Sequence, residues 1–129
     1  MQNKVMKVGI MSKQDYIKRT LAIAKGDYKP GKDEPKIWFE SIQSLAQVLS
    51  AENQKLLRTI IQHEPRSIAH LESLTHRNKS NLSRTLKTME RYGIVELKKE
   101  KRRVLPRVKV TDFTVEFGLN YSSPAQSPV

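Results

Sequence analysis

The residues Ser67–Val110, SIAHLESLTHRNKSNLSRTLKTMERYGIVELKKEKRRVLPRVKV, decide the fold of this chain. Helical apolar spacing over Ile68–Leu74 follows Ser67, which is placed as an N-cap. A break at Thr75-His76-Arg77-Asn78 then separates this helix from a second one over Lys79–Tyr92, for which Asn78 is placed as the N-cap. Gly93 ends the second helix, and two strand-like runs follow around the basic tip Lys98–Arg103. This order predicts a winged helix-turn-helix, in which the second helix fits the DNA major groove and the hairpin reaches phosphates or the minor groove.

Positive charge is concentrated in the same stretch. The 129 residues include 24 Lys and Arg against 13 Asp and Glu, for a formal net charge of +11. Twelve basic and four acidic residues lie between His76 and Asp112, whereas Ile37–Thr75 holds three basic and four acidic residues. Because the excess falls on the predicted second helix and hairpin, it indicates a nucleic-acid-binding surface. The alternative is a charged face that is only solvated.

The segment before this motif predicts a helix and a linker. Met1–Ile10 shows weak alternation and is either disordered or an arm. Ser12 precedes a predicted amphipathic helix, Lys13–Lys25, whose apolar stripe is broad enough to pack on a partner chain. Asp27–Pro35 combines Pro, Gly and charge, which is typical of a linker or exposed loop.

Short strands and capped helices are predicted on both sides of the motif. Ile37–Phe39 suits a strand with Trp38 in the core, and Ser41 and Ser50 are placed to open two further helices. Alternation over Phe113–Phe117 predicts a half-buried strand that pairs with Ile37–Phe39. Pro106 interrupts the second hairpin strand, so an edge strand with a break or bulge is expected there.

These elements predict a mainly α fold with a small β-sheet, a winged helix-turn-helix with an extra N-terminal helix. Residues 1–36 are expected to form an arm, helix and linker for dimer or partner contact. Residues 37–120 would form the DNA-binding domain, and the polar residues 121–129 a disordered tail.

The residues expected to contact DNA lie on the second helix and the hairpin tip. If Leu82, Leu86 and Met89 face the core, the opposite side of the helix presents side chains of the types that read base edges. The hairpin tip cannot join a core, so phosphate or minor-groove contact gives it a purpose, solvation alone being the alternative. The predicted DNA-binding residues are Arg77, Asn78, Lys79, Ser80, Asn81, Ser83, Arg84, Lys87, Lys99, Lys101, Arg102 and Arg103.

Other chemistry is poorly supported by the residues present. There is no cysteine, and His63, His70 and His76 lack metal-ligand spacing, so no metal site or cofactor is expected. Glycine-rich phosphate loops and nucleophile motifs are missing, which predicts that the protein is not an enzyme. No apolar run approaches the roughly 20 residues of a membrane span, and no signal peptide is recognisable, so we expect a cytoplasmic protein without a membrane partner.

The run Leu45–Phe117 resembles the MarR-like winged helix-turn-helix transcriptional regulators of prokaryotes. The phrases that carry this resemblance are IWFESIQSLAQVLSAENQKLLRTI, SIAHLESLTHRNKSNLSRTLKTMERYGIVEL, the basic turn, RVKV and DFTVEF. It implies that Lys79–Tyr92 is the recognition helix. Some similar proteins look like antitoxins that are encoded beside a small toxin and repress their own operon. The basic turn departs from many relatives, which have a glycine-containing turn there.

The function expected from this sequence is that of a transcriptional regulator, a repressor that binds double-stranded DNA as a homodimer. Paired half-sites provide specificity that one recognition helix lacks. The helix around Ile17 and Leu21, or the Trp38 segment, would supply the dimer contacts. One alternative is a protein-interaction module whose main task is to neutralise a toxin through its N-terminal region. Another is non-specific binding of chromatin or RNA, driven by charge alone.

Overall fold

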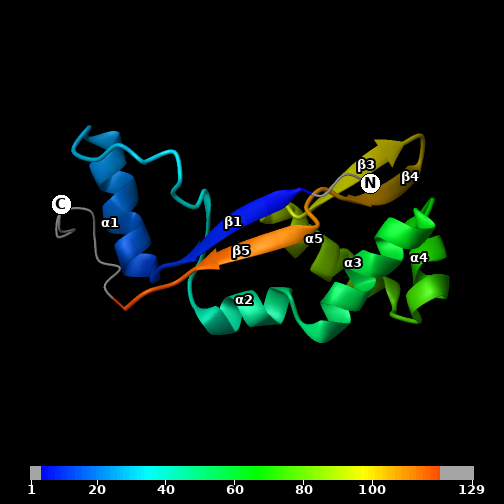
Figure 1. Ribbon diagram of the computed structural model, residues 1–129. Coiled ribbons are helices and arrows are strands. Elements are labelled where there is room, and N and C mark those ends of the chain that lie inside the picture. Colours follow the sequence, from blue (N-terminus) through cyan, green and yellow to red (C-terminus); the bar gives the residue numbers. More distant parts are fainter. Residues whose placement is uncertain (1–3, 120–129) are drawn as a thin grey trace. The chain divides into compact units, whose positions relative to one another are not determined.

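The computed structural model describes residues 4–119, which fall into two compact units (Figure 1). One unit consists of residues 4–6 with Ala46–Asp112, and is called the winged unit below. The other consists of Lys7–Leu45 with residues 113–119, and is called the N-terminal unit. The chain passes between them within β1 (Val5–Ile10), within α2 (Ile42–Val48) and at the start of β5 (Asp112–Glu116).

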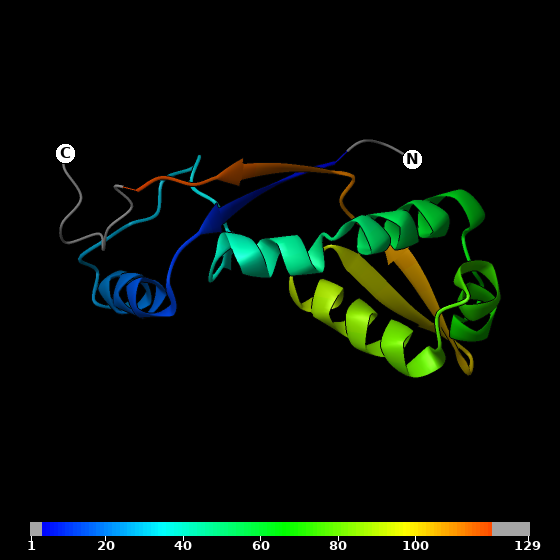
Figure 2. The same cartoon turned by 90° about the horizontal axis from the view of Figure 1, so that it is seen from below.

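Three capped helices make up the helical part of the winged unit: α3 (Ala51–His63), α4 (Ile68–Thr75) and α5 (Lys79–Arg91) (Figure 2). The side chains of Ser50, Ser67 and Asn78 each accept a hydrogen bond from the backbone N–H three residues further on. These bonds satisfy N–H groups that have no partner inside the helix. All three predicted caps are therefore confirmed, and each fixes where its helix begins.

An apolar interior holds these helices against each other and against the hairpin. Its fully buried side chains are 0% or 1% exposed, and each contributes about 1.5–3 kcal/mol through removal from water. They come from every helix of the unit and from the start of the hairpin: Leu56, Ile60, Leu71, Leu82, Leu86, Met89, Ile94 and Val95. The predicted inward stripe of the second motif helix, Leu82, Leu86 and Met89, is confirmed.

The hairpin predicted as a wing consists of β3 (Val95–Glu100) and β4 (Arg103–Val108), paired antiparallel from Val95↔Val108 to Glu100↔Arg103. It begins directly after α5, because Gly93 adopts a φ of +78° that ends the helix and turns the chain. Only Lys101 and Arg102 form the loop, so the tip is narrower than the six-residue basic turn expected from the sequence. Lys101 has a φ of +57°, a conformation that a two-residue hairpin loop requires of its first residue.

The break or bulge expected at Pro106 is absent from this hairpin. Pro106 pairs with Leu97 in an uninterrupted register, so the prediction of a break or bulge is wrong, whereas the prediction of an edge strand is confirmed. The Pro106 carbonyl oxygen accepts a hydrogen bond from Nη1 of Arg107, which places this residue's backbone polar groups on the side away from β3. Since β4 has no second neighbour in its two-stranded sheet, the missing N–H of proline costs no ladder hydrogen bond.

A three-stranded sheet with the order β2-β1-β5 includes the first described residues of the chain. β1 pairs in parallel with β2 (Ile37–Phe39), and Val8 and Ile10 are buried. The prediction that this segment is disordered or forms an arm is therefore wrong for residues 5–10. The predicted strand pairing is also wrong, because β1 lies between β2 and β5. Within β5 only Phe113 is partly buried, so the predicted half-buried face is not formed.

Helix α1 (Lys13–Ala24) begins at the predicted cap, where Ser12 Oγ accepts a hydrogen bond from the Asp15 N–H. Its single buried residue is Arg19, whose guanidinium lies 5.0 Å from the ring centroid of Trp38 and 5.8 Å from that of Tyr28. Nη2 of Arg19 also lies 3.7 Å from Oε2 of Glu34. Asp27–Pro35 is thus a loop that packs on the helix, and Trp38 is half-buried and covered by a cation.

The predicted division at residue 36 does not separate the strands, because β1 before it pairs with β2 after it. The mainly α fold with a winged helix-turn-helix and an extra N-terminal helix is confirmed. The tail predicted for 121–129 lies outside the described residues. Between residues 4 and 119, no helix has both the length and the apolar composition needed to cross a membrane.

Candidate nucleic-acid interface

The outward face of α5 carries a row of polar and basic side chains. Helical geometry places Ser80, Arg84 and Lys87 opposite the buried stripe of Leu82, Leu86 and Met89. All three outward residues are exposed, as are Lys79 and Asn81 on the flanks, while Ser83 is half-buried at one margin. The predicted outward orientation agrees with the burial of these side chains except that of Ser83.

The cations on this face are available to a ligand. In residues 4–119, no carboxylate lies within ion-pair distance of Lys79, Arg84 or Lys87. The helix that presents them is held at its first turn by Asn78, whose Oδ1 accepts a hydrogen bond of 2.8 Å from the Asn81 N–H. Positive side chains on a fixed helical edge can bind phosphates or the acceptor atoms of base edges.

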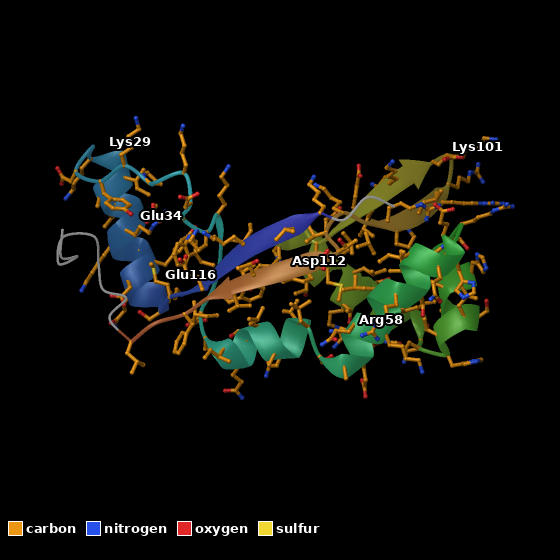
Figure 3. All side chains as sticks on the ribbon, viewed as in Figure 1. Lys29, Glu34, Arg58, Lys101, Asp112 and Glu116 are labelled. Atoms are coloured by element: carbon orange, nitrogen blue, oxygen red, sulfur yellow. The ribbon has the colours of Figure 1, made fainter. Side chains whose placement is uncertain are left out.

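A second cationic group lies at the tip of the wing. Lys99, Lys101, Arg102 and Arg103 are all exposed, and none of them pairs with a carboxylate of the described chain. Figure 3 shows the Lys101 side chain at the far end of the hairpin. A groove of about 480 Å³ separates this tip from the end of α3, and its lining includes His63, Arg66, Lys101 and Arg103.

The two cationic groups are not brought into one cluster. The start of α5 lies beside the start of α3, since Nη1 of Arg77 donates a hydrogen bond to Oδ1 of Asn53. The wing tip instead lies beside His63 at the other end of α3. At 1.5 Å per residue, the ten residues between these two points span roughly 15 Å, the length of about four to five base pairs. A duplex can therefore meet α5 and the wing at separate points.

Three of the predicted contact residues use side-chain atoms within the protein: Arg77, Asn78 and, through its Oδ1 alone, Asn81. The side-chain oxygen of Asn78 already accepts the hydrogen bond that caps α5. Arg77 donates hydrogen bonds to Asn53, Asn81 and Thr85, so all three of its guanidinium nitrogens already have protein partners. A sequence pattern cannot show the contact between Arg77 and Asn53, because the two residues lie 24 positions apart.

The positions of two further arginines, Arg91 and Arg107, were not predicted from the sequence. Arg91 is exposed and continues the outward row of Arg84 and Lys87 by one helical turn, a position that the spacing of seven residues from Arg84 already indicated. Arg107 is instead structural: its Nη1 donates to the carbonyl oxygen of Pro65 at 2.9 Å and so ties β4 to the loop between α3 and α4.

The charge difference between the two units agrees with this placement. The residues of the winged unit include sixteen basic and seven acidic side chains, and those of the N-terminal unit eight and six. The positive potential is therefore strongest on the unit that contains α5 and the wing.

No cluster of His, Asp and Glu suited to a metal ion occurs in residues 4–119.

The architecture of the winged unit is that of a winged helix-turn-helix protein. Residues 48–115, more than half of the chain, match the model of the family described as HVO_A0114, and the chain belongs to that family. No curated protein matches the chain. One similar solved structure is the crystal structure of the predicted DNA-binding transcriptional regulator from E. coli. It is 20% identical, with a TM-score of 0.45 over 53% of this chain and 73% of the other.

Proposed function

We propose that this protein is a sequence-specific, double-stranded DNA-binding transcriptional regulator of the MarR-like type that acts as a repressor. The observation that carries the proposal is the exposed row Ser80, Arg84 and Lys87 on a capped helix whose other face is fully buried. Arg can donate two hydrogen bonds to guanine, and a rigid helix fits the major groove. The unpaired cations of the wing add sequence-independent attraction to phosphates.

Selection of bound duplexes from a random pool tests sequence-specific binding. The selected duplex should then compete far better than random duplex of the same length at one fixed salt concentration. Single-stranded DNA and double-stranded RNA of the same sequence serve as controls. Equal competition by every nucleic acid would favour binding by charge alone and contradict the proposed reading of bases. A promoter carrying the selected duplex in a reporter cell should be less active when the protein is present.

The regulator is proposed to bind as a homodimer through the outward face of α1. This helix exposes Ile17 and Leu21, which are 47% and 53% exposed, and also Tyr16. An apolar row that points away from its own unit is typical of a surface covered by another chain. The nearly balanced charge of the N-terminal unit lets two copies approach there, whereas two winged units would repel each other.

The oligomeric state tests this assignment of the α1 face. The parent protein should sediment as a dimer, and Ile17→Gln with Leu21→Gln should sediment as a monomer with a weaker affinity for a palindromic site. Lys18→Gln, on the same helix but outside the apolar row, should leave the dimer intact. A double variant that remains dimeric would assign the contact to another surface.

The same apolar face supports a second candidate function, that of an autoregulating antitoxin that masks a toxin protein. Deletion of residues 1–36 cannot test this cleanly, because it removes β1 from the sheet. Co-expression with the product of an adjacent small gene is a better experiment. If the Ile17→Gln, Leu21→Gln variant loses that complex but still forms a dimer, the result would favour the toxin partner over the self-contact.

A further inference from the structure

The turn between α4 and α5 contains an arginine that is held on every nitrogen. Nε of Arg77 donates to Oδ1 of Asn81 at 2.7 Å, Nη1 to Oδ1 of Asn53 at 3.0 Å, and Nη2 to Oγ1 of Thr85 at 3.1 Å. Two of these partners are on α5 and one is on α3, so the guanidinium joins the two helices. Such planar, multidentate contact is specific to arginine and cannot be reproduced by lysine.

Asn53 is itself fixed, which makes the network rigid. Its Nδ2 donates to the carbonyl oxygens of Gln47 and Val48 at the end of α2, at 3.3 Å and 3.0 Å. Its backbone N–H donates to Oγ of Ser50. The amide of Asn53 therefore has a defined orientation, with its oxygen toward Arg77.

The same reasoning fixes the side-chain amide of Asn81. A guanidinium only donates hydrogen bonds, so the Asn81 atom that faces Nε must be the carbonyl oxygen. The NH₂ group of Asn81 then points away from Arg77, on a residue that is exposed on the flank of α5. In the described residues this NH₂ group has no protein acceptor, and it is the polar group that Asn81 offers to a ligand.

We propose that Arg77 is a positioning residue that makes Asn81 a fixed hydrogen-bond donor toward DNA, so that Asn81 selects a base carrying an acceptor. This inference rests on the proposed binding of duplex DNA. In the major groove the acceptors are purine N7, guanine O6 and thymine O4, whereas cytosine presents its N4 donor. In this proposal Arg77 does not contact DNA itself. This positioning role takes the place of the direct DNA contact predicted for Arg77 from the sequence.

Duplex selection with four proteins tests the inference: the parent, Asn81→Ala, Arg77→Lys and Arg84→Ala. Asn81→Ala and Arg77→Lys should both lose the preference at one and the same base position, by about threefold to tenfold, the range for one neutral hydrogen bond. Preferences at other positions should stay. Arg84→Ala, the matched control, should lose its preference at a different position. Arg77→Lys keeps the charge, so a mere phosphate contact by Arg77 would leave the base profile unchanged.

Asn81→Asp gives a second readout that does not depend on the fold of an Arg77 variant. The carboxylate retains the contact with Arg77 but presents an acceptor, so the preference at that position should move toward a base with a major-groove donor, cytosine N4 or adenine N6. An unchanged base profile in both Asn81→Ala and Arg77→Lys, with a clear preference in the parent, overturns this inference alone. A parent that shows no preference for any duplex overturns the proposed function and the inference together.

Discussion

Helices α5 and α1 have nearly equal lengths, 13 and 12 residues, but they bury opposite kinds of side chain. α5 buries Leu82, Leu86 and Met89 and exposes its basic residues, whereas α1 buries Arg19 and exposes Ile17 and Leu21. The difference lies in what each helix meets. α5 packs into an aliphatic interior, while α1 meets two aromatic rings and the carboxylate of Glu34, which stabilise a buried cation.

The contrast teaches that an amphipathic pattern does not by itself say which face is covered. Outward cations on α5 suit a polyanion, since they remain unpaired within the described chain. Outward apolar residues on α1 suit another protein surface. The two helices therefore divide the proposed work of the protein into nucleic-acid binding and association.

The largest expected effect comes from Leu86→Ala compared with Leu21→Ala. Leu86 is 0% exposed, so its truncation leaves a cavity and should lower the free energy of unfolding by about 2–5 kcal/mol. Leu21→Ala should lower it by less than about 1 kcal/mol at protein concentrations low enough for monomers, because the side chain is 53% exposed. Urea unfolding of both variants measures this difference. Equal losses would mean that the outward face of α1 is covered within its own chain.

Substitution of Arg19 tests whether α1 requires the charge or only the bulk of its buried side chain. Arg19→Ala should destabilise by about 2 kcal/mol, because it removes packing and the cation–π contacts with Tyr28 and Trp38. Arg19→Met should remain within about 1 kcal/mol of the parent, since an apolar side chain of similar length often replaces a buried charge without loss. Thermal unfolding measures both. A methionine variant as unstable as the alanine variant would show that the charge itself is required.

On the outward face of α5, Arg84→Ala should cost about 1–3 kcal/mol of binding to the selected duplex and relax its base preference, as loss of one bidentate contact does. Its free energy of unfolding should not change, because the side chain is exposed and unpaired. Titration of labelled duplex gives the affinity, and the unfolding curve is the control. Binding equal to that of the parent would refute the assignment of α5 as the recognition helix.

The smallest effect on base preference is expected from Arg102→Ala with Arg103→Ala in the wing. These two substitutions should weaken binding to all sequences alike. The steepness of log affinity against log salt should decrease by about 0.9 for each lost phosphate contact. Measurement of affinity at several salt concentrations tests this. A change of base preference would instead place the wing tip in a groove, where it reads bases.

Local signals in the sequence were sufficient for most of the winged unit. Ser50, Ser67 and Asn78 cap helices where predicted, because a cap requires only the nearest three residues. The inward stripe of α5 follows from helical periodicity in the same way. The hairpin and its antiparallel pairing followed from Gly93 and the strand-like runs on both sides of the basic tip.

Predictions that depended on distant partners were less successful. β1 looked too weakly patterned to be a strand, but its pairing with β2 buries Val8 fully. Pro106 does not interrupt its strand as predicted, because β4 is the edge strand that the proline also indicated and needs no N–H on its open side. Arg77 looked like a free cation, since nothing near it in sequence reveals Asn53 as its partner.

The sequence by itself determined where the helices of the winged unit begin, which face of α5 is apolar, and where the positive charge is concentrated, because these properties depend on residues only a few positions apart. Tertiary structure alone decided the contact of Arg77 with Asn53, the burial of Arg19 in place of Leu21, and the place of β1 between β2 and β5. Those outcomes depend on groups that folding brings together from distant parts of the chain, and a local pattern carries no information about them.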